Sequence, residues 1–179
     1  MFEDGSVYEG TARGDFKETA CEIVFNTSMT GYVEILTDPS YAGQGVVMTY
    51  PMIGNYGISR EDFESERLQP SAFIVHELSS DPSNFRCTDT IENLLKEYNI
   101  PCISGVDTRA VVKKLRESGT MRGVLTSDIG DRERLMDVIK SFRQIDLVGS
   151  VTAKQTKVYG EENTGAEIAL MDFGTKRNI

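Results

Sequence analysis

Residues 24–57 constrain the fold of this chain more than any other stretch, because short apolar runs alternate there with a high density of turn-forming residues. Glycine tolerates positive φ and lets two backbones approach closely, whereas proline fixes φ. Such a stretch is typical of a β-rich core with tight turns or of a shaped surface that exposes main-chain groups, and the pattern alone favours the core. The turn-forming residues are Asn26, Thr27, Ser28, Gly31, Asp38, Pro39, Ser40, Gly43, Gly45, Pro51, Gly54, Asn55 and Gly57.

The first half of the chain is predicted to be rich in β-strands. Apolar runs that alternate with polar residues, or that are bounded by turn residues, predict strands. The predicted strands cover residues 6–10, 21–25, 32–36, 45–50 and 72–76. Residues 58–69 are charged and have no clear period, so we expect an exposed loop with one helical turn there.

The second half of the chain indicates helices, because apolar residues recur there at helical spacing. Asp89 and Glu92 are expected to form a capping box, and Asp107 is interpreted as a helix cap, with an active-site acid as the alternative. Together the two halves predict a mixed α/β domain. The predicted helices start at Asp89 and cover residues 108–117 and 131–142, and the predicted strands between them cover residues 102–105 and 122–126.

The C-terminal residues predict the start of a second domain. Residues 152–166 are polar and contain two glycines, which is typical of an interdomain linker. Residues 167–172 (E-I-A-L-M-D) form an apolar run of the kind buried in parallel sheets, and residues 173–179 indicate a strand-to-helix turn. Because such a strand needs neighbours, we expect a second α/β domain to begin here and to be cut off.

Charge and cysteine content exclude several classes of function. A net charge of −9 argues against a nucleic-acid partner, because phosphate binding needs clustered Lys and Arg. No apolar run approaches the roughly 18 residues of a membrane helix, and the N-terminus lacks the pattern of a signal peptide. Cys21, Cys87 and Cys102 form no C-x-x-C, so neither a disulfide framework nor a metal site is expected. The expected compartment is a reducing cytoplasm.

Few residues suggest catalysis by themselves. His76 is the one histidine, and a nucleophilic pair with Cys87 or Cys102 would be needed for a cysteine hydrolase. Because His76 ends an apolar run and no cysteine follows a strand-to-helix pattern, a partly buried histidine and structural thiols are the simpler interpretation. Ser40, in the turn D-P-S-Y, would hold a hydroxyl in a fixed place, although a plain turn serine is the default.

Several long sequence words resemble one known family, the small (glutamine amidotransferase) subunit of carbamoyl phosphate synthetase. The resemblance covers essentially the whole chain, but family members usually carry a longer apolar strand before Glu3. The matching words are F-N-T-S-M-T-G-Y (25–32), E-I-L-T-D-P-S-Y (34–41), T-Y-P-M-I-G-N-Y-G (49–57), S-N-F-R (83–86), G-V-D-T-R (105–109), L-R-E-S-G (115–119) and M-D-F-G-T-K-R-N-I (171–179).

The resemblance implies a fold and a division into domains. Residues 1–151 would form the layered β/β/α N-terminal domain of that subunit. Residues 152–166 would be the linker, and residues 167–179 the first strand and turn of a truncated class I glutamine amidotransferase domain.

The resemblance also implies a function as part of an enzyme, a glutamine-hydrolysing ligase. In the family the small subunit hydrolyses glutamine with a cysteine, a histidine and a glutamate, none of which falls within residues 1–179. Ammonia then passes to the large subunit, which uses bicarbonate, ATP and magnesium. The D-P-S-Y serine contacts glutamine, and Ser40 is the matching position. No cofactor is implied in this domain, and the partners are the large subunit, in a heterodimer, and L-glutamine through the following domain.

The product would serve arginine or pyrimidine biosynthesis, between which the sequence does not decide, and this chain alone is expected to be inactive. Two alternatives stay open from the sequence: a free-standing binding or structural module of the same fold, and an autonomous cysteine hydrolase.

Overall fold

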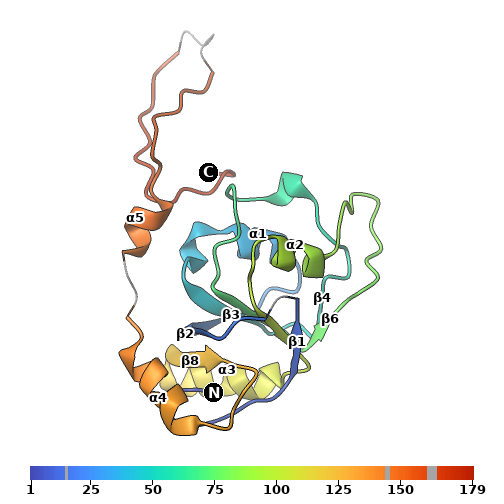
Figure 1. Ribbon diagram of the computed structural model, residues 1–179. Helices are drawn as coiled ribbons and strands as arrows, with labels where there is room; N and C mark the ends of the chain where they lie inside the picture. Colours follow the sequence, from blue (N-terminus) through green and yellow to red (C-terminus); the bar gives the residue numbers. More distant parts are fainter. Residues whose placement is uncertain (15, 144–145, 161–164) are drawn as a thin grey trace.

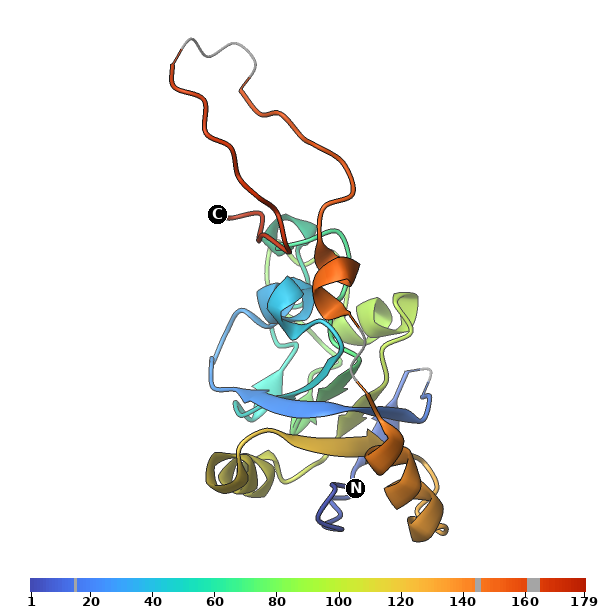
Figure 2. The same ribbon diagram turned by 90° about the vertical axis from the view of Figure 1, so that its left-hand side faces the viewer.

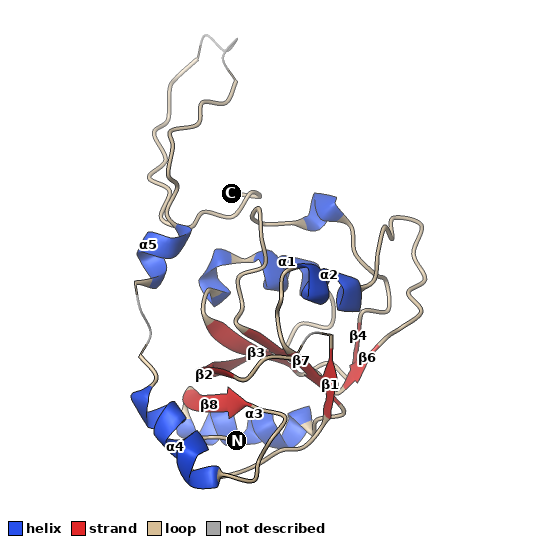
Figure 3. Cartoon of the chain, in the orientation of Figure 1, coloured by secondary structure: helices blue, strands red, loops and turns tan. Residues whose placement is uncertain are grey.

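A six-stranded mixed sheet runs through the centre of the molecule (Figures 1 and 3). The computed structural model describes residues 1–14, 16–143, 146–160 and 165–179. The strand order is β1-β7-β5-β3-β2-β8; the four inner strands are parallel, and the edge strands β1 and β8 are antiparallel to their neighbours. The strands are β1 (Thr11–Arg13), β2 (Thr19–Asn26), β3 (Gln44–Met48), β5 (Ala72–Ile74), β7 (Cys102–Ser104) and β8 (Met121–Leu125), and a second, two-stranded sheet pairs β4 (Met52–Ile53) with β6 (Glu77–Leu78).

Helices cover both faces of the main sheet, as the edge-on view shows (Figure 2). The first two helices pack on one face, and the next two lie on the other face beside β2, β3 and β8. The helices are α1 (Tyr32–Thr37), α2 (Ile91–Glu97), α3 (Thr108–Ser118), α4 (Arg132–Ser141) and α5 (Leu147–Val151), and the 3₁₀ turns are η1 (Pro39–Tyr41) and η2 (Arg60–Asp62).

Alternation along the inner strands divides the core between the two faces. Val46 and Met48 pack with α1 and α2, whereas Val47 between them packs with α3. Phe73 and Ile74 on β5 divide in the same way. Successive side chains of a strand point to opposite faces, so a sheet covered on both faces has apolar residues at every position. The mixed α/β class predicted from the sequence is therefore confirmed.

Most predicted elements are present. The strands expected at residues 21–25, 45–50, 72–76, 102–105 and 122–126 are β2, β3, β5, β7 and β8, and the helices expected at 108–117 and 131–142 are α3 and α4. The charged loop contains its one helical turn, η2.

Two strand predictions in the first half are wrong. Residues 6–10 form no strand, because the chain joins the sheet only at Thr11, opposite Ser104 of β7. Residues 32–36 form helix α1 instead of a strand. Tyr32, Val33 and Leu36 are fully buried, and the spacing of one and three residues places them on one side of a helix. β-branched residues suggested a strand, but this packing decides the conformation.

One predicted cap is right and one is wrong. The Oδ1 of Asp107 accepts a hydrogen bond from the amide of Ala110 at 2.9 Å, which confirms the cap of α3. The cap of α2 is Thr90, whose Oγ1 accepts from the amide of Asn93 at 3.2 Å. Asp89 instead accepts from the amide of Thr90 and from the side-chain amide of Asn93. The predicted capping box of Asp89 with Glu92 is therefore wrong.

The C-terminal residues leave the domain and return to it. After α5 two extended arms project away from the sheet, and the chain end comes back beside the domain (Figures 1 and 2). Part of the predicted linker, residues 161–164, lies outside the described residues. The strand predicted at residues 167–172 does not form: Ile168 is 92% exposed and Leu170 64% exposed, and neither belongs to a strand. Among the described residues, no helix combines the length and apolarity needed to cross a membrane.

Candidate functional site

The D-P-S-Y turn is a rigid element at the end of α1. The Oδ1 of Asp38 accepts a hydrogen bond from the amide of Ser40 at 2.9 Å, and the carbonyl of Asp38 accepts from the amide of Tyr41 at 3.0 Å. Pro39 takes the first position of η1, where its missing N–H costs nothing. Asp38 and Pro39 are buried, whereas Ser40 is exposed. The turn thus presents the Ser40 side chain to solvent from a fixed backbone.

A pair of tyrosines fixes the other end of α1. The rings of Tyr32 and Tyr56 stack with centroids 4.2 Å apart. The hydroxyl of Tyr56 accepts from the amides of Gly31 at 2.6 Å and Tyr32 at 3.3 Å, and the hydroxyl of Tyr32 donates to the carbonyl of Gly57 at 2.8 Å. Burial raises the pKa of both tyrosines, so both keep their protons at neutral pH. The word T-Y-P-M-I-G-N-Y-G therefore holds the start of the helix that leads to Ser40.

A polar hollow of about 310 Å³ lies beside this turn. Two residues that line the hollow are hydrogen-bonded to each other: the side-chain amide of Asn26 donates to the hydroxyl of Tyr41 at 2.8 Å. Burial raises the pKa of Glu34, which lies in the same wall. Ser40 belongs to the turn between two lining residues and does not itself line the hollow. The lining residues are Asn26, Ser28, Thr30, Gly31, Glu34, Ile35, Asp38, Tyr41, Glu64 and Lys176.

The C-terminal segment, residues 172–179, contributes Lys176 to the lining of this hollow. Nζ of Lys176 lies 2.7 Å from Oδ2 of Asp38, and the side-chain amide of Asn178 donates to Oε1 of Glu64 at 3.0 Å. Asp172 accepts hydrogen bonds from the amides of Gly174 at 2.9 Å and Thr175 at 2.7 Å, which closes the turn expected after residue 172. Carboxylates and an ammonium group around one hollow suit a small polar ligand that carries both charges.

The histidine and the cysteines do not form a nucleophilic site. Burial raises the pKa of Cys21 and of Cys102 to about 12, so both are protonated at neutral pH and are poor nucleophiles. Nδ1 of His76 lies 3.0 Å from the carbonyl oxygen of Val106, and Sγ of Cys87 contacts the carbonyl of Asp89. Within the described residues no hydrogen bond joins His76 to a cysteine, and no group of His, Cys, Asp or Glu has the arrangement of a metal site.

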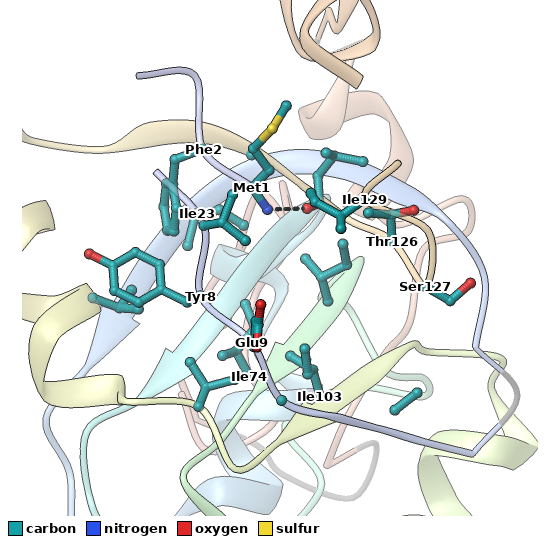
Figure 4. A pocket seen from close by; sticks show the side chains of 18 of the residues that line it. Met1, Phe2, Tyr8, Glu9, Ile23, Ile74, Ile103, Thr126, Ser127 and Ile129 are labelled. Carbon is teal, nitrogen blue, oxygen red and sulfur yellow. Dashed lines mark hydrogen bonds between the residues drawn. The ribbon is translucent and has the colours of Figure 1, made fainter. Parts of the chain in front are cut away.

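Sequence reasoning missed a second, apolar pocket of about 440 Å³ on the opposite face of the sheet (Figure 4). The first residues of the chain close one side of it, where the amide of Val124 donates to the carbonyl of Met1 at 2.8 Å. Ile23, Ile74 and Ile103 form part of its apolar lining. Its polar groups are few, so the pocket offers burial of apolar surface and little orientation of a ligand.

Comparison with known proteins finds one family throughout. Residues 1–125 match the family model described as "Carbamoyl-phosphate synthase small chain, CPSase domain". Three similar relatives all carry the name carbamoyl phosphate synthase small chain. They come from Clostridium perfringens (46% identity over 100% of this chain and 51% of the relative), Caldanaerobacter subterraneus subsp. tengcongensis (47%, over 99% and 47%) and Archaeoglobus fulgidus (47%, over 99% and 50%). The chain spans about half the length of these curated relatives.

Proposed function

Because the chain belongs to the carbamoyl-phosphate synthase small-chain family, we propose that it is the N-terminal domain of a glutamine-hydrolysing small subunit. In this role it docks on the large synthetase subunit and helps to complete the glutamine site. The whole enzyme, a ligase, makes carbamoyl phosphate from glutamine, bicarbonate and ATP. ATP and magnesium act on the large subunit. We also propose that the enzyme is cytoplasmic and that its product serves arginine or pyrimidine biosynthesis.

The observation that carries this proposal is the meeting of two neighbouring sequence words and a distant third at one polar hollow. Asn26 and Ser28 come from the first word, Asp38 and Tyr41 from the second, and Lys176 from the last. Irregular backbone that presents unpaired N–H and C=O groups suits recognition of a small polar ligand such as glutamine. Ser40 lies on the turn between the lining residues Asp38 and Tyr41 and is our candidate for the glutamine contact.

The proposed domain division follows the same reasoning. Residues 1–151 are the N-terminal domain, for which we propose the family's layered β/β/α type. Residues 152–166 are the linker. Residues 167–179 start the class I amidotransferase domain, and the exposed side chains of Ile168 and Leu170 support this, since a strand of that domain's sheet would bury them.

The chain by itself is proposed to be inactive in glutamine hydrolysis. Cys21 and Cys102 are buried thiols, and the hollow offers no activated nucleophile among the described residues. Glutamate release by this chain, lost when one cysteine is replaced, would instead support an autonomous hydrolase.

Docking is tested by co-elution of the chain with a carbamoyl phosphate synthetase large subunit on a sizing column. An unrelated acidic domain of similar size is the control, because a net charge of −9 could give non-specific association. We expect a stable complex. A folded chain that elutes alone, together with a full small subunit that also fails to bind, would contradict the proposal and favour a free-standing module.

The glutamine contact is tested in the complex formed by the small subunit that carries this chain and its large-subunit partner. Ser40→Ala should raise the KM for glutamine about tenfold and change kcat little, as expected when one ligand hydrogen bond is lost. Synthesis from ammonium salts should be unchanged. An unaltered KM for glutamine would refute the role of Ser40.

A further inference from the structure

We propose that Lys176 is a positioning residue for Ser40: it holds the D-P-S-Y turn through Asp38, so that the C-terminal segment sets where the Ser40 hydroxyl lies. The inference rests on the proposed function, in which Ser40 contacts glutamine. It assigns a task to a lysine that lies far from the turn in the sequence.

The carboxylate of Asp38 connects the two residues directly. One oxygen, Oδ1, accepts from the amide of Ser40 at 2.9 Å, and the other, Oδ2, lies 2.7 Å from Nζ of Lys176. The Asp38 side chain is only 10% exposed. A shielded, charge-assisted hydrogen bond restrains its partners more strongly than a surface ion pair does. The hydrogen bond to Asp38 is also the main cause that raises the pKa of Lys176, so the lysine is charged at neutral pH.

Glu64 gives the same segment a second attachment. Its Oε1 and Oε2 accept from the side-chain amide and the backbone amide of Asn178 at 3.0 and 3.3 Å, and its carbonyl accepts from the amide of Arg177 at 2.8 Å. The amide of Glu64 in turn donates to Oγ1 of Thr37 at 2.9 Å. Thr37 is the residue before Asp38, so the two attachments reach consecutive residues, separated from Ser40 only by Pro39.

Gly174 brings the segment against the turn itself. A Cβ on Gly174 would lie 3.2 Å from Cβ of Pro39 and 2.7 Å from Cγ2 of Val151. Side chains at this position would push the segment away from Pro39, so the close approach needs glycine. Residues 174–178 are thus attached at Asp38 and Pro39 of the turn and, through Glu64, at Thr37 before it, and only the Lys176 contact ends on the carboxylate that holds Ser40.

The first experiment measures the Ser40 amide in the 179-residue chain, where no catalytic property is needed. Lys176→Met should speed the hydrogen exchange of this amide about threefold to fivefold and shift its NMR resonance. The reason is that Asp38 loses its ion pair, and the free energy of such a pair corresponds to about that factor in the exchange rate. Lys113→Met, an exposed lysine on α3, is the matched control and should leave the Ser40 amide unchanged. An unchanged amide in Lys176→Met would overturn the proposal.

A double-mutant cycle separates the ion pair from the turn hydrogen bond. Asp38→Asn keeps an oxygen that can accept from the Ser40 amide but removes the charge that Lys176 contacts. Lys176→Met should therefore add little to the exchange of the Ser40 amide once Asp38→Asn is present. Effects of the two substitutions that simply multiply would show that Lys176 does not act through Asp38 and would also overturn the proposal.

The second experiment uses the complex of small and large subunits. Lys176→Met should raise the KM for glutamine about threefold to fivefold with kcat within about twofold, and Lys176→Arg should restore most of the affinity. A defect confined to the KM for glutamine is what misplacement of Ser40 predicts, whereas general loss of structure in the small subunit would also lower kcat for glutamine-dependent synthesis.

The outcomes distinguish this inference from the proposed function. An effect of Ser40→Ala on the KM without an effect of Lys176→Met overturns the positioning role alone. A Ser40→Ala variant with normal KM refutes the glutamine role of Ser40, and the kinetic part of this inference with it. Changes in both variants, together with the altered Ser40 amide, support the proposal.

Discussion

Gly57 should be one of the least replaceable positions in the chain. Its φ of +68° lies in the left-handed region, and its carbonyl accepts the hydroxyl of Tyr32. A Cβ at Gly57 would lie 2.2 Å from Sγ of Cys87 and 3.0 Å from the carbonyl oxygen of Asp89. Alanine therefore meets both a backbone penalty and a steric one.

The two penalties can be added. A left-handed backbone costs a non-glycine residue about 1–2 kcal/mol, and forcing an extra carbon into packed surroundings costs about 1–3 kcal/mol. Gly57→Ala should lower the free energy of unfolding by about 2–5 kcal/mol, which lowers Tm by roughly 4–20 °C in a chain of this size.

Urea unfolding of the 179-residue chain, followed by circular dichroism, measures this loss. Gly5→Ala is the matched control, because Gly5 has a φ of +82° but no atom within 4 Å of the added Cβ. The control should cost only the backbone part, about 1–2 kcal/mol. Cys87→Ala introduced beside Gly57→Ala removes the sulfur and should restore at least about 1 kcal/mol. Equal losses for Gly57→Ala and Gly5→Ala, with no recovery from Cys87→Ala, would refute the steric reasoning.

Two further predictions concern acid stability and thiol reactivity. The hydrogen bond from Arg134 is the main cause that lowers the pKa of Glu18 from 4.5 to about 2, so its stabilising contribution is complete above pH 4.5 and is lost as the pH falls towards 2. Glu18→Gln should make the free energy of unfolding less dependent on pH between 5 and 2. The effect should be small because the Glu18–Arg134 pair is partly exposed. A pH series of urea unfolding curves that matches the wild type would contradict this. Iodoacetamide at pH 8 should modify Cys87 in the folded chain but spare the buried Cys21 and Cys102, as measured by mass spectrometry. In urea all three cysteines should react. Modification of Cys102 in the folded chain would contradict its burial and its raised pKa.

How far the sequence predicted the fold depended on the length of each regular pattern. Helices α3 and α4 carry an apolar face over ten residues or more, and both were predicted closely. Helix α1 has six residues and is stabilised by long-range packing and by the Tyr56 hydroxyl, so its local pattern resembled a strand. Tertiary contacts override weak local propensity in such short elements.

The candidate site was less predictable from the residues alone. Ser40 was singled out by its turn and by the family resemblance, since nothing in D-P-S-Y by itself distinguishes a ligand contact from a turn serine. Glu64 and Lys176 were not predicted as part of the site. Glu64 meets Asn178 across 114 positions of the chain, and no periodicity in either segment encodes such a contact. Glu64 stands out in the structure because it is a buried glutamate in a charged loop. Its burial could not be recognised from the sequence.

The position of β8 at the sheet edge has a consequence for biosynthesis. β2 pairs with β3 shortly after it in the chain, but its other edge stays open until β8 has been made, and the first residue then pairs with Val124, 123 positions away. Closing so long a loop is slow, and an open strand edge can recruit the wrong partner. On the ribosome, where a chain grows by roughly 5–20 residues per second, β2 would wait several seconds for its last neighbour. Chaperone binding to nascent chains should therefore fall once residues 121–125 have left the exit tunnel.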